Sequence, residues 1–296
     1  MFPEIPAGHW RITRLLFLLL FGLLARQELA GATVLPTQKS GLTSAQVAAN
    51  PELVHARLRA KNPDYQNQAE FAVDPALGLV GDLSRGGVED LSPLQGIPFG
   101  ALDLKGLPIG DLVPLRGMPL TLLGLEDTRV CDLSPLAGMK IEKLYLNNTA
   151  VSDLKPLAGM PLKEVMLVGT QVKDLRPLRR TPIQQLWLNA TAVADISPLA
   201  DCPLVSLTLD GTSVSDLRPL SKMVSLQRLH IGGTKVTDLT PLKGLKLTRL
   251  IFTPKNITAG LETIRNMKTV TELGTSLESR MPPKQFWQLY DQQKSR

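Results

Sequence analysis

The chain has 296 residues, of which 43% are hydrophobic and only 4% aromatic, and it carries a net charge of +6. A composition dominated by leucine with so few aromatics favours many equivalent, small core positions over one irregular globular core. The excess of lysine and arginine over acidic residues is compatible with an anionic polymer as a partner.

The first 32 residues carry the features of a secretory signal. Arg11 and Arg14 precede an apolar run over residues 15–25, and small residues follow at 30–32. At about 1.5 Å per residue this run spans roughly 16 Å, well short of the roughly 30 Å hydrocarbon layer of a membrane. We therefore expect residues 1–32 to be a signal peptide and the protein to be secreted or in the cell envelope, with an uncleaved N-terminal membrane anchor as the alternative. Cleavage would remove three arginines and two glutamates, so the net charge would fall from +6 to +5.

Residues 33–80 are expected to form a linker and an N-terminal helical cap. Asn50, Pro51 and Glu52 are together typical of a helix start, with an N-cap side chain, a proline in the first turn and an acid near the positive pole. Asn62 and Pro63 should end this helix. A capping strand is expected at 71–73, because an open stack would expose its first edge.

From residue 90 to residue 242 the chain repeats one five-residue motif eight times. The motif is aspartate, then Leu or Ile, any residue, proline and leucine, and its period is 21 residues until a last step of 22. The aspartates are Asp90, Asp111, Asp132, Asp153, Asp174, Asp195, Asp216 and Asp238. A fixed period in this range predicts a stacked solenoid over residues 81–253, because no single repeat can bury its own apolar face.

Each repeat is expected to contain a short strand and a return segment. Leu204, Leu207 and Leu209 alternate with polar residues, which is the pattern of a strand with one buried side. Glycines such as Gly169 and Gly211 should turn the chain out of the sheet. The aspartate should then cap a 3₁₀ or extended Leu-x-Pro-Leu segment, which is too short for a full α-helix.

The frame Leu-x-x-Leu-x-Leu-x-x-Thr-x-Val-x-Asp-Leu-x-Pro-Leu resembles the leucine-rich repeat, in the short bacterial form of the internalins, over residues 79–252. The resemblance implies an α/β repeat solenoid, a curved leucine-rich repeat with a concave parallel β-sheet, short 3₁₀ or extended convex segments and helical caps. The family usually has asparagine where this chain has threonines such as Thr149 and Thr170. We expect their hydroxyls to donate to carbonyls of the neighbouring strand.

Residues 254–296 should form a C-terminal cap and tail. A short helix over 258–268 and a degenerate strand at 270–273 precede the aromatic pair Phe286 and Trp287. We favour a capping role for this pair over a docking patch. The tail resembles the ends of secreted or receptor-borne repeat regions in Planctomycetes-like bacteria.

The two cysteines, Cys131 and Cys202, are predicted to be free and mostly buried thiols. They lie about three repeats apart, roughly 15 Å at about 4.8 Å per strand, whereas a disulfide spans roughly 7 Å at most.

No residue pattern supports catalysis. His230 is the only histidine within the repeats, no His/Cys cluster has metal spacing, and no nucleophile elbow occurs. The repeated aspartates are equivalent caps rather than an acid and base pair. We expect no enzyme activity, no metal and no cofactor.

The residues that differ between repeats carry the functional prediction. The position between the two strand leucines should face the concave sheet, and it holds Asp103, Gly124, Tyr145, Met166, Trp187, Thr208, His230 and Ile251. Tyr145, Met166 and Trp187 should form one contiguous patch, because successive strands lie about 4.8 Å apart. Tyrosine and tryptophan often anchor protein interfaces.

The resulting hypothesis is a ligand-binding patch for a protein or peptide partner outside the cytoplasm. Its predicted rim is Lys143, Gln185, Asn147, Asn189, Arg228 and His230. Alternatively, Tyr145 and Trp187 only stack and stiffen the sheet. A second function is attachment to an anionic envelope polymer through basic residues of the return side, namely Arg176, Arg179, Arg180, Arg218 and Lys222. Nucleic acid is not an expected partner.

Overall fold

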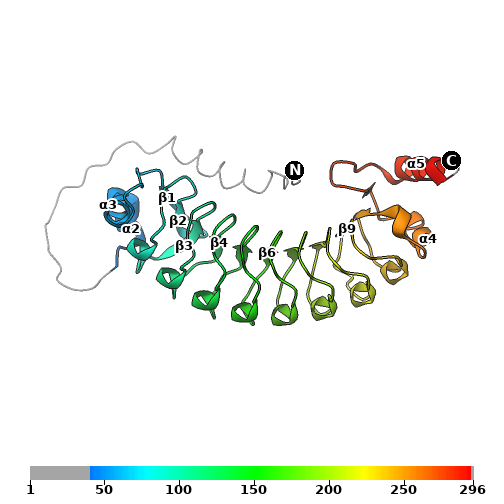
Figure 1. Ribbon diagram of the computed structural model, residues 1–296, viewed down its shortest axis with the longest axis horizontal. Helices are drawn as coiled ribbons and strands as arrows, with labels where there is room; N and C mark the ends of the chain where they lie inside the picture. The colour runs from blue at the N-terminus through cyan, green and yellow to red at the C-terminus, as the bar shows by residue number, and fades with distance from the viewer. Residues whose placement is uncertain (1–40, 295–296) are drawn as a thin grey trace. The chain divides into compact units, whose positions relative to one another are not determined.

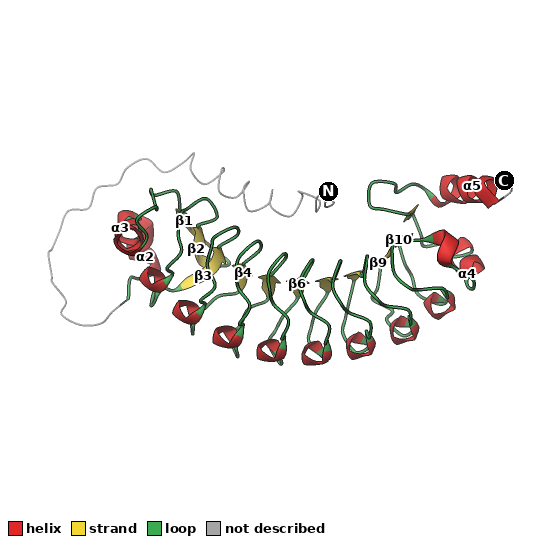
Figure 2. Cartoon of the chain, in the orientation of Figure 1, coloured by secondary structure: helices red, strands yellow, loops and turns green. Residues whose placement is uncertain are grey.

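The computed structural model describes residues 41–294, and the residues from Leu42 onward form one compact unit. The expected signal peptide and the linker residues 33–40 lie outside this described part. Within it, the repeats follow one another along a curve, with strands on the inner side and 3₁₀ segments on the outer side (Figure 1, Figure 2). The predicted α/β solenoid with a concave sheet is confirmed.

One sheet of 11 strands runs through the repeats, and its strands lie side by side in chain order. Its members are β1 Glu70–Asp74, β2 Gly78–Asp82, β3 Phe99–Asp103, β4 Leu122–Gly124, β5 Lys143–Tyr145, β6 Glu164–Met166, β7 Gln185–Trp187, β8 Ser206–Thr208, β9 Arg228–Ile231, β10 Arg249–Phe252 and β11 Glu272–Gly274. The strands from β2 to β11 pair in parallel. The constant period sets this register, since Leu102 pairs with Leu123 and Leu123 with Leu144.

The return segments are 3₁₀ helices, as predicted. They are η1 Ser92–Leu94, η2 Val113–Leu115, η3 Ser134–Leu136, η4 Lys155–Leu157, η5 Arg176–Leu178, η6 Ser197–Leu199, η7 Arg218–Leu220 and η8 Thr240–Leu242, with η9 Pro254–Asn256 after the last full repeat. In each of η1 to η8 the motif aspartate accepts the N–H two residues ahead through its Oδ1 atom, at 2.7 to 2.9 Å. The capping role of the aspartates is therefore confirmed.

The core is a continuous apolar column between the sheet and the return segments. Leu144, Val151 and Leu157 of one repeat are fully buried, and the equivalent residues of the other repeats belong to the same cluster. Burial of this kind is worth about 25 cal/mol per Å² of apolar surface, so the column is the main stabilising term.

The prediction for the threonines was wrong. The Thr149 hydroxyl donates to the carbonyl of Leu146 at 2.7 Å, three residues earlier in its own repeat, and Thr170 donates to Leu167 in the same way. The reason is the turn that precedes each threonine. Asn148 and Gly169 have φ values of 57° and 70°, so the left-handed residue folds the chain back and aims the hydroxyl at its own strand.

The N-terminal cap contains α2 Ser44–Ala49 and α3 Glu52–Lys61. The expected N-cap at Asn50 was wrong, because Asn50 ends α2, while Pro51 precedes α3 without a side-chain cap bond. A helix start needs no side-chain cap when neighbouring backbone supplies the partners, and the Val54 N–H donates to the Pro51 carbonyl at 2.9 Å. Sequence reasoning also missed α2 and the antiparallel pairing of β1 with β2.

Asn62 joins the N-terminal cap to the first repeat. It ends α3, as predicted, and its side chain is 2% exposed. Its amide donates to the Leu58 carbonyl at 3.1 Å and the Asp90 carbonyl at 3.0 Å, and its oxygen accepts from the N–H groups of Glu89 and Asp90. One buried side chain thus fixes the cap against the turn into η1.

The C-terminal cap contains α4 Leu261–Arg265, which is shorter than expected, and α5 Pro283–Lys294. Phe286 and Trp287 are buried, and the Phe286 ring centroid lies 5.7 Å from that of Phe252 in β10. The aromatic pair therefore covers the end of the core, and the capping interpretation is confirmed.

Both cysteines are free, as predicted, but only Cys202 is buried. Cys131 is exposed because it occupies the position just before the motif aspartate, where the chain turns outward. The equivalent Lys173 and Ser215 are exposed as well.

Candidate functional site: the concave sheet face

The predicted concave row is present. Lateral pairing runs from Asp103 to Gly124, Tyr145, Met166, Trp187, Thr208, His230 and Ile251, in that order. A flanking row at the start of the strands runs through Lys143, Glu164, Gln185, Ser206, Arg228 and Arg249. The constant period thus brings residues far apart in sequence onto one surface.

Tyr145, Met166 and Trp187 in the concave row are less exposed than a ligand-binding patch on an open surface would be. Tyr145 is 8% exposed and Met166 is 4% exposed, whereas Trp187 is half-buried. Strands about 4.8 Å apart force large side chains in neighbouring positions to cover one another. Trp187 is therefore the large side chain of this row that offers surface to a partner, and Met166 lies between it and Tyr145 in the register.

Tyr145 is held by the neighbouring strand. Its hydroxyl donates to Glu164 Oε1 at 3.1 Å, and Lys143 Nζ lies 3.6 Å from Glu164 Oε2. Burial, followed by the negative charge of Glu164, raises the pKa of the Tyr145 phenol. Tyr145 is thus a protonated donor fixed in place, and Lys143 is the exposed member of this group.

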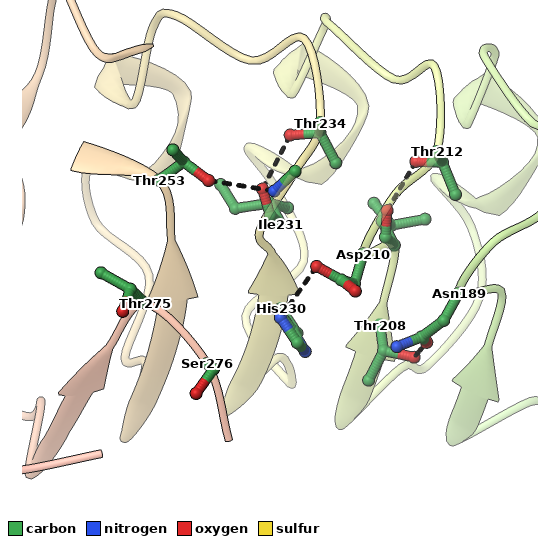
Figure 3. Close-up of polar contacts among 12 residues, drawn as sticks. Asn189, Thr208, Asp210, Thr212, His230, Ile231, Thr234, Thr253, Thr275 and Ser276 are labelled. Carbon is green, nitrogen blue, oxygen red and sulfur yellow. Dashed lines mark hydrogen bonds and ion pairs between the residues drawn. The ribbon is translucent and has the colours of Figure 1, made fainter. Parts of the chain in front are cut away.

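The two rim asparagines make bonds within the sheet. Asn147 is buried, accepts the Val168 N–H at 3.0 Å and places its amide nitrogen 3.6 Å from the Met166 sulfur. Asn189 accepts a hydrogen bond from the Thr208 hydroxyl, as Figure 3 shows. Some of the hydrogen-bonding groups of these two asparagines therefore bond to neighbouring repeats and are not available to a partner.

His230 forms a second polar group farther along the row. Its side chain is mostly buried, and its Nε2 atom lies 3.4 Å from Asp210 Oδ1, with the two side chains pointing toward each other in Figure 3. Gly232 follows on the same strand edge, and a Cβ there would lie 2.9 Å from His230 Nε2 and 2.8 Å from Asp210 Oδ1.

The remaining rim residues, Gln185 and Arg228, are partly exposed in the flanking row on either side of Ser206. The structure thus places all nine predicted site residues on one face. It differs from the sequence interpretation in exposure: Trp187, Lys143, Gln185 and Arg228 offer accessible surface, and Tyr145, Met166, Asn147 and His230 are packed beneath.

Sequence reasoning missed an acidic region at the β3–β5 end of the face. Burial raises the pKa of Asp103 to about 6 and that of Glu126 to about 7. Glu126 is 3% exposed and lies just after the end of β4, one repeat before Asn147, which lies just after the end of β5. The row two residues after the concave position of each repeat contains Glu126, so the period could have identified it, but its burial depends on the sizes of its neighbours.

Within residues 41–294 no group of three or more His, Cys, Asp or Glu side chains is arranged to hold a metal ion. In the same described part, no helix has the length and apolar character needed to cross a membrane.

Comparison with solved structures decides the fold. Internalin C2 of Listeria monocytogenes superposes with a TM-score of 0.57 at 24% identity, over 71% of this chain and 96% of that one. The fold is that of a leucine-rich repeat solenoid. A leucine-rich repeat protein of Leptospira interrogans is 18% identical over 62% of this chain and 56% of its own, with a TM-score of 0.48. No protein-family model matches the sequence, and no curated protein does.

Proposed function

We propose that this protein is a non-catalytic binding module that recognises a protein or peptide partner outside the cytoplasm through its concave sheet. The observation that carries the proposal is the half-buried Trp187 at the middle of that face. A large side chain left partly uncovered in an otherwise closely packed row is typical of an interface anchor. A bacterial source, export by the N-terminal segment and location in the envelope belong to this proposal.

The surroundings of Trp187 support a protein partner. Gln185 on the same strand and Arg228 two strands farther on offer hydrogen-bond donors, and Tyr145 and Met166 form an apolar floor on one side. A central aromatic with a polar rim is the usual anatomy of a protein interface. An extended curved sheet also matches an extended partner surface better than a small molecule.

The test is capture of partners from native envelope by the immobilised full-length protein. Trp187→Ala should abolish capture and leave the melting temperature nearly unchanged, because little core surface is lost. Val224→Ala is the matched control, since Val224 is 78% exposed and lies in the turn between η7 and β9, outside the sheet. Equal capture by wild type and Trp187→Ala, or a large loss of stability in Trp187→Ala, would contradict the proposal and favour an aromatic row that only stiffens the sheet.

The alternative is a structural envelope protein held by basic charge to an anionic polymer. The return side does carry the predicted bases, but several are already paired. Arg176 lies 2.7 Å from Asp174, Arg218 lies 2.8 Å from Asp216, and Arg180 lies 3.8 Å from Asp201. These ion pairs lower the positive electrostatic potential of the return side, so we favour the concave face as the binding site. Retention on envelope material that falls steeply with salt would instead support the polymer.

A further inference from the structure

Arg228 differs from the other basic residues of the protein in its surroundings. Arg228 and Arg249 are less exposed than every other lysine or arginine that the structure describes. The two are direct neighbours across β9 and β10, and the Arg249 side chain donates to Glu272 of β11. Within residues 41–294, the Arg228 guanidinium forms neither an ion pair nor a hydrogen bond. A partly buried charge without a counter-charge costs free energy, so stability does not explain this arginine.

The other charged residues of the same flanking row are paired. Lys143 of β5 and Glu164 of β6 form an ion pair, with 3.6 Å between Nζ and Oε2. Arg249 and Glu272 form another at the far end of the row. Along the described row from β5 to β11, Arg228 is therefore the one charged residue that no neighbour balances. The adjacent Arg249 adds to the positive potential there, since like charges on neighbouring strands repel.

Two neutral donors lie beside Arg228 in this row. Ser206 pairs with Arg228 in the register and Gln185 pairs with Ser206, so the three residues lie on successive strands about 4.8 Å apart. In the part of the chain that the structure describes, neither the Gln185 amide nor the Ser206 hydroxyl forms a hydrogen bond. The short serine lies between two long side chains, so all three donor groups can reach one ligand.

The three donor groups also reach the surface. Gln185 and Arg228 are partly exposed, and Ser206 is 7% exposed. None of the enclosed side-chain nitrogen or oxygen atoms that lack a partner in the described chain belongs to these three residues. A ligand on the concave face can therefore contact them without any rearrangement of the sheet.

We propose that Gln185, Ser206 and Arg228 bind the carboxylate of an aspartate or glutamate side chain on the partner. This inference rests on the proposed function, since it names the chemistry of one residue of the partner that the concave face recognises. A guanidinium donates two parallel hydrogen bonds to a carboxylate, and the hydroxyl and amide can donate to its remaining lone pairs.

The charge of the site favours a carboxylate over a phosphate group. A carboxylate carries one negative charge, which the single unbalanced charge of Arg228 matches. A phosphate on a side chain carries roughly two at neutral pH. The other bases of the row, Lys143 and Arg249, are already paired and do not supply the second positive charge.

The probe is Nα-acetyl-glutamate methylamide, titrated at constant ionic strength into the isotope-labelled full-length protein and followed by NMR of the arginine Nε–H groups. We expect a saturable shift of the Arg228 resonance, and none with Nα-acetyl-glutamine methylamide, which has the same shape without the charge. Equal shifts with both compounds, or equal shifts of all arginines, would overturn the proposal. Tighter binding of inorganic phosphate than of the glutamate derivative would overturn the choice of a carboxylate.

Arg228→Gln removes the charge and should weaken probe binding about tenfold or more, as expected for a lost hydrogen bond to a charged group. Its melting temperature should equal or exceed that of wild type, because a partly buried charge without a partner is removed. Lys235→Gln is the matched control, since Lys235 is exposed, lies between β9 and η8 and carries the same charge. Equal weakening in Lys235→Gln, or a marked loss of stability in Arg228→Gln, would overturn the proposal and leave Arg228 with a general or a structural role.

Two further variants separate a defined site from general positive potential. Arg228→Lys keeps the charge and loses the planar guanidinium, and Ser206→Ala keeps the charge and loses one donor. Each should weaken probe binding about threefold or more. Binding as tight as that of wild type in both variants would show that only the potential attracts the probe, and the site would be refuted.

The experiment also distinguishes this inference from the proposed function. Probe binding with no envelope capture by wild type would refute the proposed function alone. Envelope capture that is equal for wild type and Arg228→Gln, with no probe binding, would refute the carboxylate site alone.

Discussion

Carboxylates on the return side and on the concave face of the repeats have pKa values shifted in opposite directions. On the return side, the side chain of Arg176 and the capped backbone N–H lower the pKa of Asp174 to about 2, and backbone N–H donors lower the pKa of Asp90 and Asp132. On the concave face, burial raises the pKa of Asp103 and Glu126. The same chemical group is a solvent-exposed cap with a lowered pKa on one face and a buried carboxyl with a raised pKa on the other.

The difference separates residues that build the solenoid from residues that do not. Every motif aspartate has a backbone donor within 2.9 Å, so its presence is explained by the fold. Glu126 Oε2 has no partner, so the fold gives no reason for it. A buried polar group that lowers stability points to selection for something other than stability.

The largest expected loss of stability comes from Leu186→Ala on β7, in contrast to a small loss from Trp187→Ala at the next residue. Leu186 is fully buried in the core, and Trp187 faces the concave side. Leu186→Ala should lower the free energy of unfolding by about 2 to 5 kcal/mol, because it leaves a cavity. Trp187→Ala should cost less than about 1 kcal/mol. Chemical denaturation of both variants measures the contrast, and similar losses would mean that the two sides of the strand are equally structural.

Glu126→Gln should stabilise the protein at pH 8 by about 1 to 3 kcal/mol, since it removes a buried charge. In the folded chain the pKa of Glu126 is about 7, above its ordinary value of 4.5, so the folded state binds the proton more tightly than the unfolded state. Stability is therefore lost as pH rises from about 4.5 to about 7, and the advantage of the variant should shrink as pH falls through that window. Asp103 and Asp127 raise this pKa further and Lys105 lowers it. Denaturant melts at pH 5 and pH 8 test the sign, and an advantage independent of pH would contradict it.

Removing one cap should have a smaller effect. Asp195 accepts the Ser197 N–H at 2.8 Å, and Asp195→Ala should destabilise the protein by about 1 kcal/mol. Asp195→Asn is the control, because the amide oxygen can still accept this bond. A loss in the asparagine variant as large as in the alanine variant would mean that charge rather than capping stabilises the turn.

The smallest effect is expected at the exposed ion pairs of the return side. Arg218→Ala should leave the melting temperature unchanged, because exposed pairs contribute little. The pKa of Asp216, which the Arg218 side chain lowers, should rise toward its ordinary value in a carboxyl NMR titration. A clear drop in melting temperature would show that the return side depends on its charges.

Features that repeat with the 21-residue period could be predicted from the sequence, and features that do not repeat could not. The row from Asp103 to Ile251 and the eight aspartate caps repeat with the period, so alignment alone predicted both. The caps of the solenoid do not repeat, and there Asn50 was misplaced and α2 was missed. The exposure of each concave side chain could not be predicted from the repeat pattern either. Tyr145 is packed because Met166 and Glu164 lie beside it, and such neighbour effects are absent from a single repeat.

The strict chain order of the 11 strands has a consequence for how this surface can change. Because each coil touches only the coils before and after it, a whole unit can be gained or lost without disturbing distant ones. Excision of residues 153–173 would join two intact units and bring Tyr145 beside Trp187. Duplication would separate anchors in increments of one strand, so gene rearrangement could alter the length of the recognition surface while every buried leucine kept its surroundings.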